Sequence, residues 1–149
     1  RRLARIVKRC QEIPGQNLFQ YLVENGERHT ITSADVNAYL QTLTGADFTA
    51  KDYRTWAGSV LALGELRALD WQPESAAKKH LTAMIKTVAG QLRNTPAVCR
   101  KCYIHPMLFD AFLAGELKTL RRAAARKGLD GDESLLMRFL ERLPVDRSH

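Results

Sequence analysis

Residues 73–89 read PESAAKKHLTAMIKTVA, and this stretch decides the fold class. Five of its apolar residues follow the pattern i, i+3, i+4, i+7, i+8, namely Leu81, Met84, Ile85, Val88 and Ala89. Because an α-helix has 3.6 residues per turn, this spacing puts all five on one helix face. Pro73 and Ser75 are typical of a helix start. The stretch therefore predicts a helix with one face in a core.

Start and stop signals predict further helices before this one. Residues 1–11 have an apolar face, and a capping box at residues 32–35 opens a helix that stops at Gly45. The same starting signal recurs at residues 49–52. We expect the helix that it opens to direct five side chains toward the core, namely Tyr53, Ala57, Val60, Leu61 and Leu66.

Helices are also predicted after it. Thr95-Pro96 is an N-cap followed by proline at the first helical position, and this helix should close before Pro106. Two or three helices follow, broken near Gly115, at residues 128–131 and at Pro144. No repeat, long linker or domain boundary is evident. The prediction is a mainly α, compact single helical domain with at most a short strand or hairpin near residues 17–31.

Composition favours a soluble chain with a polyanionic partner. The 149 residues are 45% hydrophobic, and 23 Lys and Arg against 16 Asp and Glu give a net charge of +7. No apolar run exceeds four residues, whereas a membrane span needs about 20. Three cysteines make no disulfide framework and fit a reducing cytosol. We expect a cytoplasmic, nucleoid-associated protein that does not bind membranes.

Cations cluster in three stretches without an acid: residues 1–9, 93–101 and 118–127. The last holds Lys118, Arg121, Arg122, Arg126 and Lys127. A solvated face and a contact with the DNA backbone are both compatible with that stretch.

Cys99-Arg100-Lys101-Cys102 is the one motif with the spacing of a redox or metal site. A thioredoxin-like role needs a βαβ context, and a zinc site would also need His105 and Cys10 as ligands. Packing thiols are the simpler interpretation. No glycine-rich phosphate loop, HExxH or GxSxG occurs, so we expect no metal and no other cofactor. Phosphodiester chemistry here would require cations and a side-chain nucleophile.

Two motifs supply those groups: KDYRTW at residues 51–56 and RNTPAVCRKCY at residues 93–103. In order, spacing and flanks they resemble the catalytic domain of type IB DNA topoisomerases of the bacterial, poxvirus-like branch, and the resemblance runs over essentially all 149 residues. It implies that Tyr103 is the nucleophile and that Arg54 and Asn94 hold the phosphate. It also implies substrate binding by Lys51, Arg93, Arg100 and Lys101.

The resemblance further implies that the protein relaxes supercoiled double-stranded DNA without ATP. Tyr103 would form a 3′-phosphotyrosyl link, release a 5′-hydroxyl and later reseal the strand. The family also uses a first arginine and a hairpin lysine, upstream of the part that matches Arg1. We therefore expect residues 1–149 to be a fragment of the catalytic domain, acting as a monomer with the missing N-terminal part. Asn94 stands where many members have histidine, and Arg93 stands where glycine is usual.

Two alternatives remain open. A tyrosine recombinase shares the nucleophile, but it usually has His-x-x-Arg where this chain has Lys51-Asp52-Tyr53-Arg54. A non-catalytic basic DNA-binding module would bind with steep salt dependence and form no covalent adduct.

The predicted site also sets a geometric condition, because a straight helix would separate Asn94 from Tyr103 by roughly 13 Å. Sharing a phosphate needs a turn at Asn94 or a bend near Tyr103.

Overall fold

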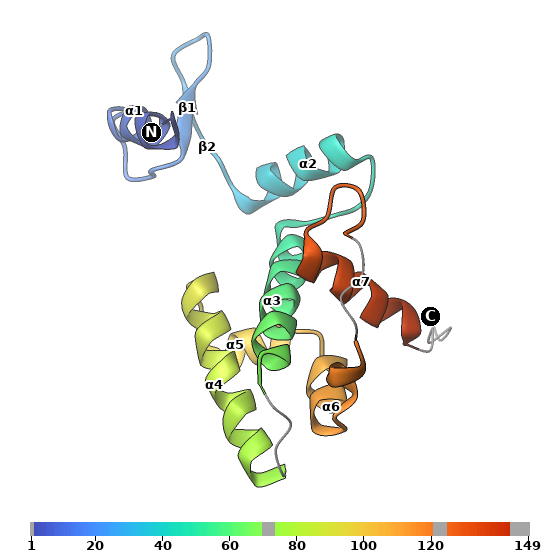
Figure 1. The fold of residues 1–149 in the computed structure, drawn as a ribbon. Helices are drawn as coiled ribbons and strands as arrows, with labels where there is room; N and C mark the ends of the chain where they lie inside the picture. The colour runs from blue at the N-terminus through green and yellow to red at the C-terminus, as the bar shows by residue number, and fades with distance from the viewer. Residues whose placement is uncertain (1, 70–73, 121–124, 144–149) are drawn as a thin grey trace. The chain divides into compact units, whose positions relative to one another are not determined.

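The computed structural model describes residues 2–69, 74–120 and 125–143. The helices are α1 (Arg2–Gln11), α2 (Ser33–Thr44), α3 (Ala50–Arg67), α4 (Glu74–Leu92), α5 (Pro96–Val98), the π-helix η1 (Cys99–Tyr103), α6 (Met107–Leu113), the 3₁₀-helix η2 (Glu116–Thr119) and α7 (Gly131–Arg142) (Figure 1). The strands β1 (Gln20–Leu22) and β2 (Arg28–Thr30) form an antiparallel hairpin. The predicted mainly α class with a short hairpin is confirmed. Among the described residues, no helix is both long and apolar enough to cross a membrane.

The chain forms two compact units, residues 1–50 and residues 51–149. We call them unit 1 and unit 2. The sequence predicts one domain because no linker marks this boundary, which falls at the first turn of α3. The division follows instead from where side chains are buried.

Unit 1 is held together by local hydrogen bonds. The Gln20 side chain is buried, and its amide donates to the carbonyls of Ile13 and Pro14. Thr32 and Asp35 form the predicted capping box of α2, and Gly45 ends that helix with φ 66°. In the described part of unit 1, no hydrophobic residue is buried.

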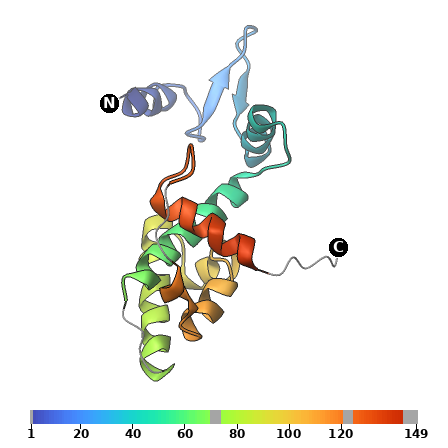
Figure 2. The ribbon, with the colours of Figure 1, turned by 45° about the vertical axis from the view of Figure 1, so that its right-hand side comes forward.

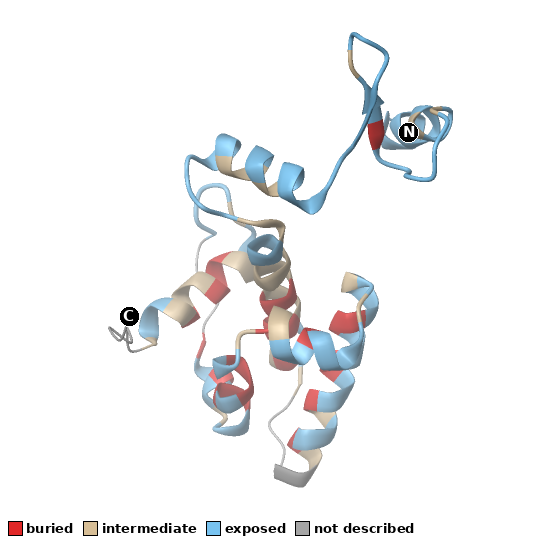
Figure 3. Cartoon of the chain, turned by 180° about the vertical axis from the view of Figure 1, so that it is seen from behind, coloured by how far each residue is buried: buried red, intermediate tan, exposed pale blue. Residues whose placement is uncertain are grey.

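Unit 2 contains the hydrophobic core. Buried positions gather on its helices in Figure 3, and α3 runs alongside α4 in Figures 1 and 2. The predicted face of α4 is confirmed, since all five of its residues are buried: Leu81, Met84, Ile85, Val88 and Ala89. Fully enclosed side chains from other elements include Leu63, Leu108 and Leu136.

One predicted core residue is misplaced. Tyr53 is 48% exposed, because burial along α3 begins a turn later, at Gly58. The N-cap at Thr95, the break at Gly115 and a start at residues 128–131 are confirmed, the last through a capping box of Asp130 and Glu133. Pro73, Arg121, Arg122 and Pro144 lie outside the described residues.

Candidate active site

Arg54 and Tyr103 lie together in unit 2. Nη2 of Arg54 donates to the carbonyl oxygen of Leu92 at 2.8 Å, which ties α3 to the end of α4. The same guanidinium lies 4.7 Å from the centroid of the Tyr103 ring, within cation–π range. Both side chains are half-buried. The structure thus pairs the two residues that the sequence motifs single out.

The backbone on both sides of Tyr103 is held by α3. Thr55 Oγ1 shares its proton between the carbonyls of Lys51 at 2.9 Å and Cys102 at 3.1 Å, and Ser59 Oγ accepts from the amide of His105 at 3.0 Å. Between them, a Cβ on Gly58 would stand 2.2 Å from the Tyr103 carbonyl oxygen. Side chains are therefore excluded at Gly58, and the two backbones meet directly.

Sequence reasoning missed these three α3 residues. Gly58 and Ser59 follow Thr55 by three and four residues, which puts all three on one helix face. The spacing of small residues in the sequence was the available signal. It does not say which segment the face packs against, because both partners lie more than 40 residues away.

The segment before Tyr103 is not a straight α-helix. After the single turn of α5, residues Cys99–Tyr103 form a π-helix, and Ile104 is extended with φ −123° and ψ 127°. One-turn π-helices are frequent at functional sites. The bend that the sequence argument requires near Tyr103 is therefore present.

A turn at Asn94 is present as well. The amide of Asn94 donates to the Ala89 carbonyl, and the amide of Arg93 donates to the Gly90 carbonyl. These two bonds define a Schellman motif, whose left-handed position normally carries glycine. Arg93 occupies that position with φ 52°. Glycine adopts this left-handed conformation without strain, which explains why glycine is usual at this position in the family that the chain resembles.

The Asn94 side chain does not reach the Arg54–Tyr103 pair. Its Oδ1 accepts from the amide of Thr95 at 3.2 Å. Within the described ranges, no hydrogen bond joins it to Arg54 or Tyr103. The prediction that Asn94 contacts the same phosphate as Arg54 stays a prediction.

The four predicted substrate-binding cations are exposed on the elements that carry the pair. Lys51 lies one turn before Arg54 on α3, and Arg93 follows the end of α4. Lys101 is on η1, as is Arg100, whose guanidinium lies 5.2 Å from the Phe109 ring centroid. All four are available to an anionic partner.

Cys99 packs in the core, whereas Cys10 and Cys102 are only partly buried. Cys10, Cys99 and Cys102 are free thiols, and Cys99 is fully buried. Burial raises the pKa of Cys99, the nearby Arg54 opposes that rise and Cys102 adds to it. Among the described residues, no group of three or more His, Cys, Asp and Glu could hold a metal ion.

His105 follows the tyrosine segment, and its ring is partly buried. Its Nδ1 is buried without a hydrogen-bond partner in the described part of the chain. Burial lowers the pKa of His105, because the charged form loses its hydration.

Arg54 has the chemistry of an anion-binding group. A guanidinium has five N–H donors, and in the described part of the chain the Leu92 carbonyl takes one of them. Its planar fork suits two oxygens of one phosphate. An anion bound there would lie next to the Tyr103 ring.

Comparison with known proteins shows the family of the chain. Residues 1–125 match the family model described as eukaryotic DNA topoisomerase I, catalytic core. The chain is also 31% identical over 106 residues to DNA topoisomerase 1B of Acanthamoeba polyphaga mimivirus, covering 66% of this chain and 32% of that protein. It thus spans about a third of the length of this relative. The chain therefore belongs to the family of the topoisomerase I catalytic core.

Proposed function

We propose that the chain is part of an enzyme that relaxes supercoiled DNA by transient single-strand cleavage and religation, without ATP or metal. The observation that carries the proposal is the Arg54 guanidinium, 4.7 Å from the Tyr103 ring and tied to Leu92. A cation is thereby placed beside the phenol that the resemblance identifies as the nucleophile. The family match supports DNA as the substrate.

The proposed cleavage step exchanges one phosphoester for another. The Tyr103 phenol loses its proton and its oxygen bonds to the scissile phosphorus, while the bond from phosphorus to the 5′-oxygen breaks. The departing 5′-oxygen takes up a proton and leaves as a hydroxyl. The 3′-phosphotyrosyl link retains the bond energy, so attack by the 5′-hydroxyl reseals the strand after rotation.

Arg54 is proposed to act on the charge that develops in this step. Negative charge grows on the non-bridging oxygens, and a preorganised donor stabilises such charge most in the transition state. Asn94 is the proposed second donor, and it stays uncharged at every pH. Lys51, Arg93, Arg100 and Lys101 are proposed to contact the DNA backbone.

The alternatives make different predictions. The topoisomerase match favours relaxation over recombination, because a recombinase would join strands in a sequence-specific way. A binding module would retain DNA affinity without forming an adduct.

We further propose that the enzyme belongs to the poxvirus-like branch in a bacterium and that it acts as a monomer in the cytoplasm. An upstream arginine and lysine are proposed to complete its site.

The test uses a duplex whose scissile 5′-oxygen is replaced by sulfur. A thiolate leaves without help from a general acid, so cleavage does not depend on a lysine outside these residues. We expect a covalent protein–DNA adduct on denaturing gels, mapped to Tyr103 by peptide mass spectrometry, that disappears in Tyr103→Phe.

Tyr53→Phe is the matched control, since Tyr53 is an exposed tyrosine on the helix that carries Arg54. It should form adduct at the wild-type rate. Adduct that persists in Tyr103→Phe would overturn the assignment of the nucleophile. DNA binding without any adduct, also after the upstream segment is added back, would favour the binding module.

A further inference from the structure

A long stretch of unit 2 carries positive charge only. Residues 75–109 contain no Asp or Glu, and their six Lys and Arg residues are Lys78, Lys79, Lys86, Arg93, Arg100 and Lys101. By contrast, the cations near α7 are paired, as Arg126 is with Glu141 at 2.7 Å and Arg67 with Asp132 at 3.9 Å. The acid-free stretch therefore contains no Asp or Glu of its own that could neutralise its cations.

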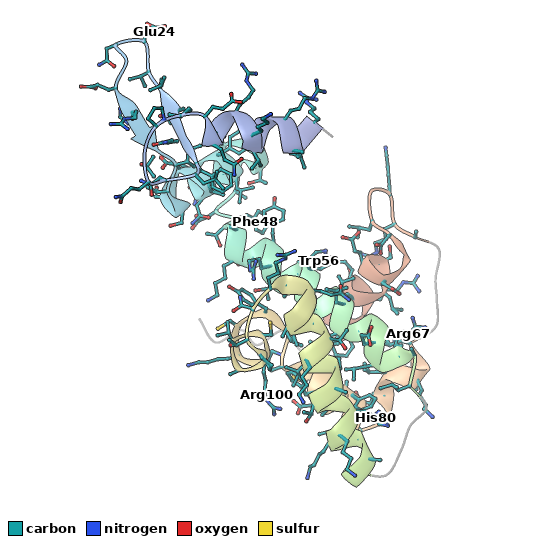
Figure 4. The ribbon with its side chains drawn as sticks, turned by 90° about the vertical axis from the view of Figure 1, so that its left-hand side faces the viewer. Glu24, Phe48, Trp56, Arg67, His80 and Arg100 are labelled. Atoms are coloured by element: carbon teal, nitrogen blue, oxygen red, sulfur yellow. The ribbon has the colours of Figure 1, made fainter. Side chains whose placement is uncertain are left out.

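Two adjoining hollows open along this stretch. Thr82, Lys86 and Arg100 line one of them, between α4, α5 and η1. Lys79, Thr82 and Lys86 line the other, along α4. Because Thr82 and Lys86 belong to both, the hollows form one groove, which we call the α4 groove; Figure 4 shows Arg100 beside α4.

The cations of the α4 groove are exposed and spaced along it. Lys79, Lys86 and Arg100 are exposed, and the described residues include no ion pair to any of them. Lys79 and Lys86 are two helical turns apart, about 10 Å along the axis. That distance matches about three steps between successive phosphates on one DNA strand, at an axial rise of roughly 3.4 Å per step.

We propose that the α4 groove binds the phosphate backbone of duplex DNA beyond the phosphate that Tyr103 attacks. This inference rests on DNA being the substrate, and it adds a contact surface outside the predicted catalytic residues. Arg100 links the two regions, since it lines the groove and lies three residues before Tyr103 on η1. Contacts of this kind set affinity and register without reading sequence.

The test measures affinity as a function of salt for Lys79→Ala/Lys86→Ala. DNA binding releases counterions, so log K falls as log salt rises, and each phosphate contact makes this slope steeper by about 0.9. Because the double variant loses two contacts, its slope should be shallower than that of the wild type by about 1.8. The wild type should bind a long duplex more tightly than one that only covers the cleavage site, and this advantage should shrink in the variant.

Arg138→Ala/Arg142→Ala is the matched control, because it removes two charges from α7 beside acidic residues. It should leave the slope within about 0.5 of wild type, on the same counterion scale. A groove variant with the wild-type slope, or a control variant with the same loss, would overturn the proposal. So would a wild-type chain that binds no duplex.

The experiments distinguish rejection of the groove proposal from rejection of the proposed function. Adduct at Tyr103 with unchanged binding by Lys79→Ala/Lys86→Ala rejects the groove alone. Groove-dependent binding without adduct, also after the upstream segment is added back, rejects the nucleophile and keeps the groove.

Discussion

Unit 1 and unit 2 use the same local signals but differ in what those signals build. Both have capping boxes, at Thr32 and Asp130, and both have helices that begin where the sequence predicts. Large apolar side chains of unit 1 stay exposed, such as Leu3 at 77% and Leu43 at 63%, whereas Leu63 and Leu136 of unit 2 are enclosed. Local signals are enough to specify the helices of both units. The contact between Arg54 and Tyr103 also needs a hydrophobic core, because it joins helices that pack together in unit 2.

The largest expected difference between the units comes from truncating a core leucine. Leu63→Ala should lower the free energy of unfolding by about 2–5 kcal/mol, since it removes buried contacts and leaves a cavity. Leu43→Ala should change it by less than about 0.5 kcal/mol, because that side chain is exposed. Urea denaturation followed by far-ultraviolet circular dichroism reports on both units, because both contain helices. Equal losses from the two variants would contradict the comparison.

A smaller effect should separate two glycines inside unit 2. Gly58→Ala should destabilise by about 1–3 kcal/mol, because its Cβ would meet the Tyr103 carbonyl and force α3 away from η1. Gly90→Ala should stabilise by about 0.5–1 kcal/mol, since nothing lies within 4 Å and alanine favours a helix. The two substitutions add the same methyl group, so thermal unfolding should show shifts of opposite sign. Shifts of the same sign would argue against direct backbone contact at Gly58.

The smallest effect concerns the turn between α4 and α5. Arg93→Gly should raise the free energy of unfolding by on the order of 0.5 kcal/mol, because relief of the left-handed strain exceeds the added freedom of the unfolded chain. Arg93→Ala removes the same charge and keeps the strain, so it should give no such gain in chemical denaturation. A glycine variant less stable than the alanine variant would refute the Schellman assignment.

Regular elements and their ends could be predicted from the sequence, because their causes are local. The apolar face of α4, the N-cap at Thr95 and the stop at Gly45 each depend on residues within a few positions. Tyr53 was misplaced because helical spacing defines a face but not where along the helix the core begins.

Long-range features of the site could not be predicted locally. Arg54 and Tyr103 were singled out by resemblance, whereas their contact depends on packing between segments far apart in sequence. The roles of Thr55, Gly58 and Ser59 depend on backbone atoms of Cys102, Tyr103 and His105, so only the fold reveals them. The π-helix η1 likewise has no short sequence signature.

Arg54, which lies beside the Tyr103 ring, is proposed to stabilise the reacting phosphate. The most direct test is the single-turnover rate of adduct formation by Arg54→Ala on the sulfur-substituted duplex, with DNA affinity measured in parallel. We expect a rate roughly 10²–10³ lower, by analogy with loss of one preorganised donor, and an affinity within a few-fold of wild type. A wild-type rate, or a loss explained wholly by weaker binding, would contradict it.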